Sequence, residues 1–254
     1  MTDAGTTTKV AEAAALLLAA RRDPAKRLAA LPEALRPADR AAAFAIQAKA
    51  AEGVAIGGWK VGAAGPDKPC ICAPMPASGI VASPAALQAG LMRGIEAEIA
   101  FRIGHDLPPR ATPYSRAEVI AAMATAHPSI EILESAYIDP DLVDPLSNLA
   151  DSIMHGGFVV GPGLAAWHGL EFQGITVTQT IGAEAMQRTG NPAGDMIRLV
   201  EWLANEGAVW AGGLKAGQIV TCGSWTGKTP APAGAAVSVS FPGVGEARAV
   251  FAAG

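Results

Sequence analysis

The stretch Gly94–Gly104 constrains the fold of this chain more than any other, because it alternates with a period of two between glycines. The apolar positions on one face are Ile95, Ala97, Ile99, Phe101 and Ile103. The positions on the opposite face are Glu96, Glu98, Ala100 and Arg102. This pattern predicts a β-strand with one face in a core and two glutamates projecting side by side from the other.

Same-face neighbours on a strand lie roughly 6.6–6.8 Å apart at Cα, so Glu96 and Glu98 repel each other unless positive charge lies between them. A divalent cation is the simplest candidate. The alternative is a solvated face on which two glutamates happen to alternate. A third carboxylate on a second strand would favour the cation.

Pro128–Ser135 supplies a candidate third carboxylate, because Ile130 and Ile132 share one face of a predicted strand and Glu131 points the other way. Three glutamates from two strands would form an all-oxygen site, which suits Mg²⁺, Mn²⁺ or Ca²⁺ and suits Zn²⁺ poorly. Glu134 would turn toward the isoleucine side, so we place it outside the ligand set.

The chain's 254 residues, half of them hydrophobic, can bury a sizeable core in one domain with an appended segment or in two small domains. Alanine-rich stretches predict helices over Thr8–Arg22 and from Pro37 or Ala38 to Gly53. We therefore expect an N-terminal helical segment over residues 1–57 and a strand-rich part over residues 58–254.

Four further elements are expected in the strand-rich part. Trp59–Val61 is a candidate strand, whereas glycine and proline turns predict an irregular loop over residues 63–79. A capping box at Ser115 and Glu118 predicts a helix reaching about Ala126. A last long helix is predicted from Asn191-Pro192 to Gly207, and together these elements indicate an α+β fold.

Charge and composition exclude several classes of partner. The formal charge of −4 and the lack of a lysine or arginine cluster argue against nucleic acid, so a small molecule is expected. Apolar runs such as Ala13–Ala20 are too short to span a bilayer, and no secretory leader is recognisable. Three cysteines without a paired framework fit reduced thiols, and we expect a cytoplasmic protein.

A set of short motifs resembles, in unbroken order, the 2-keto-4-pentenoate hydratases (2-hydroxypenta-2,4-dienoate hydratases) of the fumarylacetoacetate hydrolase superfamily and the related 4-oxalocrotonate decarboxylases. The matching pieces are Gly58-Trp59-Lys60-Val61-Gly62, residues 95–101, Ile130-Glu131-Ile132, residues 151–161, Gly190-Asn191-Pro192, residues 202–205, residues 214–220 and Gly223-Ser224-Trp225-Thr226. The resemblance covers most of residues 38–251.

The resemblance implies mixed, curled β-sheets in a barrel-like roll with outer helices, a divalent cation, usually Mg²⁺ or Mn²⁺, and a homo-oligomer. It implies a 2-oxo or 2-hydroxy-dienoic acid as substrate. Carried over by position, it makes Glu96, Glu98 and Glu131 the metal ligands and Lys60 an active-site residue. A cation at the 2-oxo acid would stabilise negative charge on its oxygen, and Lys60 would bind the carboxylate or carry a proton.

Two departures from the family pattern affect the catalytic residues. The hydratases have an acidic residue in the loop after the lysine strand, whereas the only carboxylate between Val61 and Ile95 here is Asp67. The family's Asp-Asn-Ala-Ser segment is replaced by residues 151–155, which end in His155. His155 is a candidate substitute acid or base, against the alternative of an ordinary loop histidine.

Ser224 and Thr226 are candidate substrate hydrogen-bond donors, or alternatively turn-stabilising hydroxyls. The leading functional hypothesis is a metal-dependent hydratase of 2-hydroxy-2,4-dienoates from aromatic-compound breakdown. Decarboxylation of a 2-oxo-dienedioate, with Arg93 or Arg102 binding its second carboxylate, and acylpyruvate hydrolysis are the enzymatic alternatives. A non-catalytic, metal-binding partner subunit is the alternative from another class.

Overall fold

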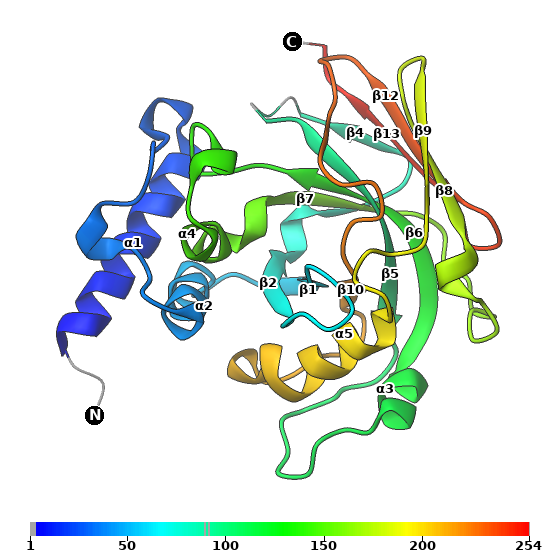
Figure 1. Cartoon of the computed structure of the whole chain (residues 1–254), viewed down its shortest axis with the longest axis horizontal. Coiled ribbons are helices and arrows are strands. Elements are labelled where there is room, and N and C mark those ends of the chain that lie inside the picture. The colour runs from blue at the N-terminus through cyan, green and yellow to red at the C-terminus, as the bar shows by residue number, and fades with distance from the viewer. Residues whose placement is uncertain (1–3, 89, 91, 254) are drawn as a thin grey trace.

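Two β-sheets and a group of N-terminal helices make up the structure, a computed structural model that describes residues 4–88, 90 and 92–253 (Figure 1). The larger sheet has the order β2-β1-β10-β5-β6-β7-β3, with β11 added to β5. Its strands are β1 (Ile56–Gly62), β2 (Ile71–Pro76), β3 (Ile80–Ala82), β5 (Gly94–Ile103), β6 (Met123–Leu133), β7 (His155–Val160), β10 (Ile219–Thr221) and β11 (Thr229–Pro230). β1 runs parallel to β10 and β3 parallel to β7, and the other neighbours are antiparallel.

The smaller sheet has the order β4-β13-β12-β8-β9 and lies across from β5 and β6 in Figure 1. Its strands are β4 (Ala85–Leu87), β8 (Thr176–Ile181), β9 (Glu184–Thr189), β12 (Ala236–Phe241) and β13 (Gly245–Phe251). The apolar face predicted for β5 is buried in the main core, where Ile99 and Phe101 join Val239 and Phe241 of β12. The opposite face of β5 is also largely enclosed, since Glu98 and Ala100 are buried.

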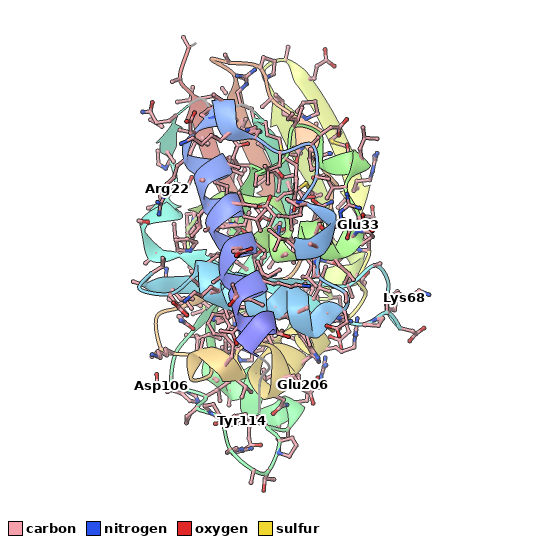
Figure 2. All side chains as sticks on the ribbon, turned by 90° about the vertical axis from the view of Figure 1, so that its left-hand side faces the viewer. Arg22, Glu33, Lys68, Asp106, Tyr114 and Glu206 are labelled. Atoms are coloured by element: carbon pink, nitrogen blue, oxygen red, sulfur yellow. The ribbon has the colours of Figure 1, made fainter. Side chains whose placement is uncertain are left out.

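The N-terminal helices α1 (Ala4–Arg22) and α2 (Arg40–Ala50) pack with α4 (Pro145–Ala150) around a second core. Figure 2 shows α1 lying across this side of the molecule. Leu17, Ile46, Tyr137 and Leu149 are among its buried members. The proposed boundary between residues 57 and 58 falls inside β1, and the division into two parts stays a prediction.

Helices α3 (Arg116–Ala122) and α5 (Met196–Trp202) lie together at the bottom of the view in Figure 1, and α5 continues as a π-helix over Leu203–Gly207. Single 3₁₀ turns occur at Pro24–Lys26, Glu33–Leu35, Ala77–Gly79, Pro140–Leu142, Ser152–Met154, Phe172–Gly174 and Val209–Ala211. No helix within the described residues is long and apolar enough to cross a membrane.

Three expectations about these elements are wrong in detail. The loop predicted over residues 63–79 contains β2, whose prolines are tolerated because β2 pairs with β1 alone at the end of the sheet. The capping box opens α3 as predicted, but the chain turns into β6 at Met123, where pairing with β5 outweighs helix propensity. The last long helix begins at Met196 with Asp195 as its N-cap, because the Asn191 side chain binds elsewhere.

Candidate metal centre and active site

Strand register brings the predicted site residues together on the inner face of the larger sheet. Glu96 on β5 pairs directly with Glu131 on β6, and Glu98 lies two residues further along β5. Lys60 on β1 pairs with Thr221 on β10, the strand between β1 and β5. Directly paired residues point to the same face of a sheet, so all of these side chains meet there.

The three glutamates form one cluster, as predicted from the two strands. Glu96, Glu98 and Glu131 each offer a carboxylate oxygen within 4.8 Å of the others. Glu98 and Glu131 are buried, and Glu96 is half-buried. Oε1 of Glu98 and Oε2 of Glu131 have no hydrogen-bond partner among the residues that the structure describes. Buried carboxylate oxygens without donors are unfavourable unless a cation binds them, so the donor set fits a hard divalent ion.

The pKa values of the three glutamates are shifted, because their negative charges are buried and only partly neutralised by nearby groups. Burial, together with repulsion from Glu131 and Glu96, raises the pKa of Glu98 well above its usual range. Burial also raises the pKa of Glu96 to about 6, although Lys60 opposes the shift. Burial acts in the same direction on Glu131, but Lys60 and His155 outweigh it and lower the Glu131 pKa.

Lys60 and His155 both lie against one oxygen of Glu131. The Lys60 Nζ atom is 2.7 Å from Glu131 Oε1 and donates to the Ile153 carbonyl at 2.9 Å. His155 Nδ1 is 3.0 Å from the same Glu131 oxygen. Burial disfavours the charge on Lys60, yet the three glutamates outweigh burial and raise its pKa. Burial lowers the pKa of His155 in spite of its contact with Glu131, so the imidazole is neutral at pH 7.

The two candidate substrate donors differ in their surroundings. A hydrogen bond from Ser224 reaches Glu96, where it lowers the pKa of that carboxyl. The Thr226 hydroxyl instead accepts from the Ala97 backbone N–H at 3.1 Å and donates to Gln179 at 2.8 Å. The bond from Ala97 fixes the 224–228 segment to β5. The hydroxyl hydrogen of Thr226 is used in the bond to Gln179.

Several residues of the site were not predicted from the sequence. The Thr221 hydroxyl donates to Glu98 Oε2. The Asn191 amide donates to the carbonyls of Cys222 at 3.0 Å and Gly223 at 3.2 Å, which holds the chain just before Ser224. Thr221 could have been found from the stretch Gln218–Cys222, because period-two alternation along a strand there selects one face for Thr221.

The two arginines suggested for a second substrate carboxylate donate to backbone carbonyls. Arg102 is exposed, lies six residues from Glu96 along β5 and donates to the Gly217 carbonyl. Arg93 donates to the carbonyls of Ala231 and Gly90. Lys228 is instead close enough to act on the pKa of Glu96, and it pairs with the exposed Asp141 at 2.6 Å.

A cavity of about 290 Å³ lies between the N-terminal helices and β2 and is lined in part by His155. Its lining is mainly apolar, with Arg21, Asp151 and His155 among the polar groups. The lining residues are Leu17, Leu18, Arg21, Gln47, Ala50, Ala51, Val54, Ile56, Pro74, Pro76, Ser78, Gly79, Ala150, Asp151, Ser152, His155 and Gly156.

Comparison with known proteins places this site in a family, although no family model matches the chain. Two proteins of Dechloromonas aromatica (strain RCB), named 2-keto-4-pentenoate hydratase 1 and 2, are each 30% identical over 261 residues. Each alignment covers 95% of this chain and 97% of the relative. The chain belongs to the 2-keto-4-pentenoate hydratase family. The resemblance seen in the motifs is confirmed.

Solved structures confirm the predicted α+β fold of this family member. A 4-oxalocrotonate decarboxylase from Pseudomonas putida G7, complexed with magnesium and adipate, has a TM-score of 0.73 and 24% identity. That alignment covers 84% of this chain and 86% of the decarboxylase. A fumarylpyruvate hydrolase from Pseudomonas aeruginosa, in complex with Mn²⁺ and pyruvate, has a TM-score of 0.56 and 16% identity, covering 77% of this chain and 89% of the other.

Proposed function

We propose that this family member is a divalent-metal-dependent lyase that hydrates a 2-hydroxy-2,4-dienoate to a 4-hydroxy-2-oxo acid. The observation that carries the proposal is the buried cluster of Glu96, Glu98 and Glu131 with Lys60 at its edge. The hydratase relatives that align over nearly the whole chain support the same reaction class.

The three glutamates are the proposed ligands of Mg²⁺ or Mn²⁺. Among the residues that the structure describes, Glu98 Oε1 and Glu131 Oε2 have no hydrogen-bond partner, so both oxygens are available to coordinate a cation. The magnesium, calcium and manganese complexes of structurally similar proteins agree with an oxygen-ligated ion. The 2-oxo acid would chelate the bound cation through its carboxylate and its C2 oxygen, and the cation would stabilise negative charge on the C2 oxygen.

Lys60 and His155 are the proposed catalytic side chains. The raised pKa keeps Lys60 charged at neutral pH, so its Nζ can bind the substrate carboxylate while the Ile153 carbonyl fixes its position. His155 is neutral, and we assign it a proton-transfer role in place of the loop acid that this chain lacks. Ser224 is the proposed substrate-binding hydroxyl, because its hydrogen bond to Glu96 places it at the glutamate cluster, whereas Thr226 donates to Gln179.

The hydration balances in two steps. The dienol takes a proton at C5 and loses its hydroxyl proton as it becomes the 2-oxo-3-enoate. Water then adds its oxygen at C4, and a proton is delivered to C3. The chain's own residues would hold the carboxylate, carry the protons and enclose the reacting atoms in the buried face of the sheet.

Decarboxylation of a 2-oxo-dienedioate is the second candidate function, and the position of Lys228 near Glu96 favours it. A second carboxylate needs a cation near the metal site, and Lys228 acts on the pKa of Glu96 while its ion pair is with the exposed Asp141. The decarboxylase with the similar fold is complexed with the dicarboxylate adipate.

Incubation of the purified protein with Mg²⁺ and each acid tests the proposal. Loss of conjugation measured by ultraviolet absorbance, without release of CO₂, is expected for a 2-hydroxy-2,4-dienoate. Release of CO₂ from a 2-oxo-dienedioate would favour the decarboxylase, and cleavage of an acylpyruvate would favour the hydrolase. Intact metal binding without turnover of any of these acids would indicate a non-catalytic partner subunit and refute the proposal.

The cellular context is also a proposal. We propose a cytoplasmic homo-oligomer that acts on a small molecule in aromatic-compound catabolism and binds neither nucleic acid nor membranes. The net charge of −4 supports the exclusion of nucleic acid, and the homo-oligomer is what the resemblance in the motifs implies. Light scattering coupled to size-exclusion chromatography would measure the subunit number.

A further inference from the structure

Three consecutive residues beside the glutamate cluster adopt a left-handed backbone conformation without any glycine. Ser152, Ile153 and Met154 have φ values of 52°, 52° and 60°. L-amino acids disfavour this region because Cβ approaches the carbonyl oxygen, and a β-branched residue such as isoleucine tolerates it least. The left-handed turn over Ser152–Met154 therefore needs contacts that hold it in place.

This turn positions both proposed catalytic side chains. Its central carbonyl, on Ile153, accepts the hydrogen bond from Lys60 Nζ at 2.9 Å. His155 follows the turn directly and reaches Glu131 with Nδ1 at 3.0 Å. The Met154 carbonyl accepts from the backbone N–H of Glu134 at 2.8 Å, which ties the turn to the end of β6. A relaxed turn would move the Ile153 carbonyl and the imidazole together.

One guanidinium on α1 joins the two ends of the turn. Arg21 Nε donates to Asp151 Oδ1 at 2.5 Å, and its Nη2 donates to the Asp151 carbonyl at 2.6 Å. Its Nη1 donates to the carbonyl of His155 at 2.6 Å. Asp151 and His155 flank the turn, so Arg21 spans it. The other Asp151 oxygen accepts from the Ser135 hydroxyl at 2.8 Å and the Ala136 N–H at 2.9 Å.

We propose that Arg21 is a positioning residue of the active site, which acts by keeping the Ser152–Met154 turn left-handed. Arg21 touches neither the glutamates nor Lys60 in any described contact, so it acts through the turn and not on the metal or substrate. The role of Arg21 in turnover rests on the proposed function, whereas its role in holding the turn does not. The N-terminal helix thereby becomes part of the catalytic apparatus.

The first experiment compares Arg21→Met, Arg21→Lys and the control Arg22→Met. Arg22 is the next residue of α1 and is exposed (Figure 2). We expect kcat to fall about 30-fold in both Arg21 variants, because lysine cannot make the forked contact with both ends of the turn. KM and the Mn²⁺ concentration for half-maximal activity should stay within threefold of wild type, and Arg22→Met should leave kcat unchanged.

A rescue separates positioning from general stability. Glycine adopts positive φ freely, so Ile153→Gly in the Arg21→Met background should hold the turn without the guanidinium and recover at least tenfold in kcat. Ile153→Ala in the same background removes a similar amount of side chain but still disfavours positive φ, and it should recover nothing. A purely structural role for Arg21 predicts equal behaviour of the two double variants.

Hydrogen exchange tests the turn without any turnover. The amides of Glu134 and Ala136, which bond to Met154 and Asp151, should exchange faster in Arg21→Met and in Arg21→Lys than in wild type and Arg22→Met. Inactive wild-type enzyme would defeat the proposed function, and the exchange rates would still decide whether Arg21 holds the turn. Unchanged exchange in both Arg21 variants, or kcat per folded enzyme within threefold of wild type, would overturn the proposal.

Discussion

Replacing Glu98 by Gln is the most direct test of the metal centre, because it keeps the side chain's size and removes one buried charge. Glu98 is 1% exposed, and its carboxylate lies within 4.8 Å of the other two. If both were ionised, two carboxylates at that separation would repel by about 3 kcal/mol at an effective dielectric constant of roughly 20, and the raised pKa of Glu98 relieves part of this repulsion in the metal-free protein. The metal-free variant should therefore be at least as stable as the metal-free wild type at pH 7.5.

The stabilisation by added metal should be smaller in the Glu98→Gln variant than in the wild type. Mg²⁺ or Mn²⁺ at about 100 times its dissociation constant stabilises the folded protein by about 2.7 kcal/mol. For a chain of this length that corresponds to a rise in melting temperature of roughly 5–10 °C. With Gln at position 98 one of the three charged ligands is lost, and we expect a rise below about 2 °C at the same concentration.

Differential scanning calorimetry with and without Mn²⁺ would measure both effects. Glu171→Gln, which changes an exposed glutamate, is the matched control and should respond to metal as wild type does. A Glu98→Gln variant that still gains stability with the wild-type concentration dependence would refute the three-glutamate site. Loss of metal-free stability in that variant would contradict the account of its electrostatics.

The same geometry leads to four further predictions. The pKa of Glu96 is raised to about 6, so the native metal-free protein binds more protons than the unfolded chain between pH 4.5 and 6. The contribution of Glu96 to the free energy of unfolding, about 2 kcal/mol, should therefore be present below pH 4.5 and lost as pH rises through 6. Urea unfolding in EDTA at a series of pH values would measure this loss. Over the same window Mg²⁺ affinity measured by calorimetry should rise with pH, since the carboxylates must deprotonate to bind. Lys60→Met should abolish turnover at saturating Mg²⁺ while retaining the metal-induced rise in melting temperature. Gly58→Ala should lower the free energy of unfolding by about 1–3 kcal/mol, because a Cβ there would lie 2.3 Å from the Ile219 carbonyl oxygen, and chemical denaturation would measure the loss.

The glutamate cluster was predictable because it depends on local patterns. Alternation with period two fixes which side chains share a face, so Glu96 and Glu98 had to project together once that stretch was a strand. The apolar residues on either side of Glu131 gave its direction in the same way. Pairing of β5 with β6, the next strand along the chain after α3, then brought the three carboxylates within reach.

The contacts around the cluster were not predictable, since they join distant parts of the chain. Arg21 and Asp151 are 130 residues apart in sequence, and no periodicity links a helix residue to a loop aspartate. The left-handed turn at Ser152–Met154 carries neither glycine nor asparagine, which are the usual signals for positive φ. β2 was missed for a related reason: proline and glycine indicated a loop, and only its place at the end of the sheet makes the prolines compatible with a strand.

The charges of the site also explain why a divalent ion suits it better than any other. Three ionised glutamates and one ionised lysine leave the enclosed face with two negative charges, because His155 is neutral at pH 7. A monovalent ion would leave one of these charges uncompensated in a buried setting, and a trivalent ion would leave a positive charge there. Without metal, protonation of Glu98 removes part of the repulsion, which is the direction of its pKa shift. Lys60 thus serves as a counter-ion in the metal-free protein, and once a divalent ion is bound we expect its ammonium to be available to the carboxylate of the proposed substrate.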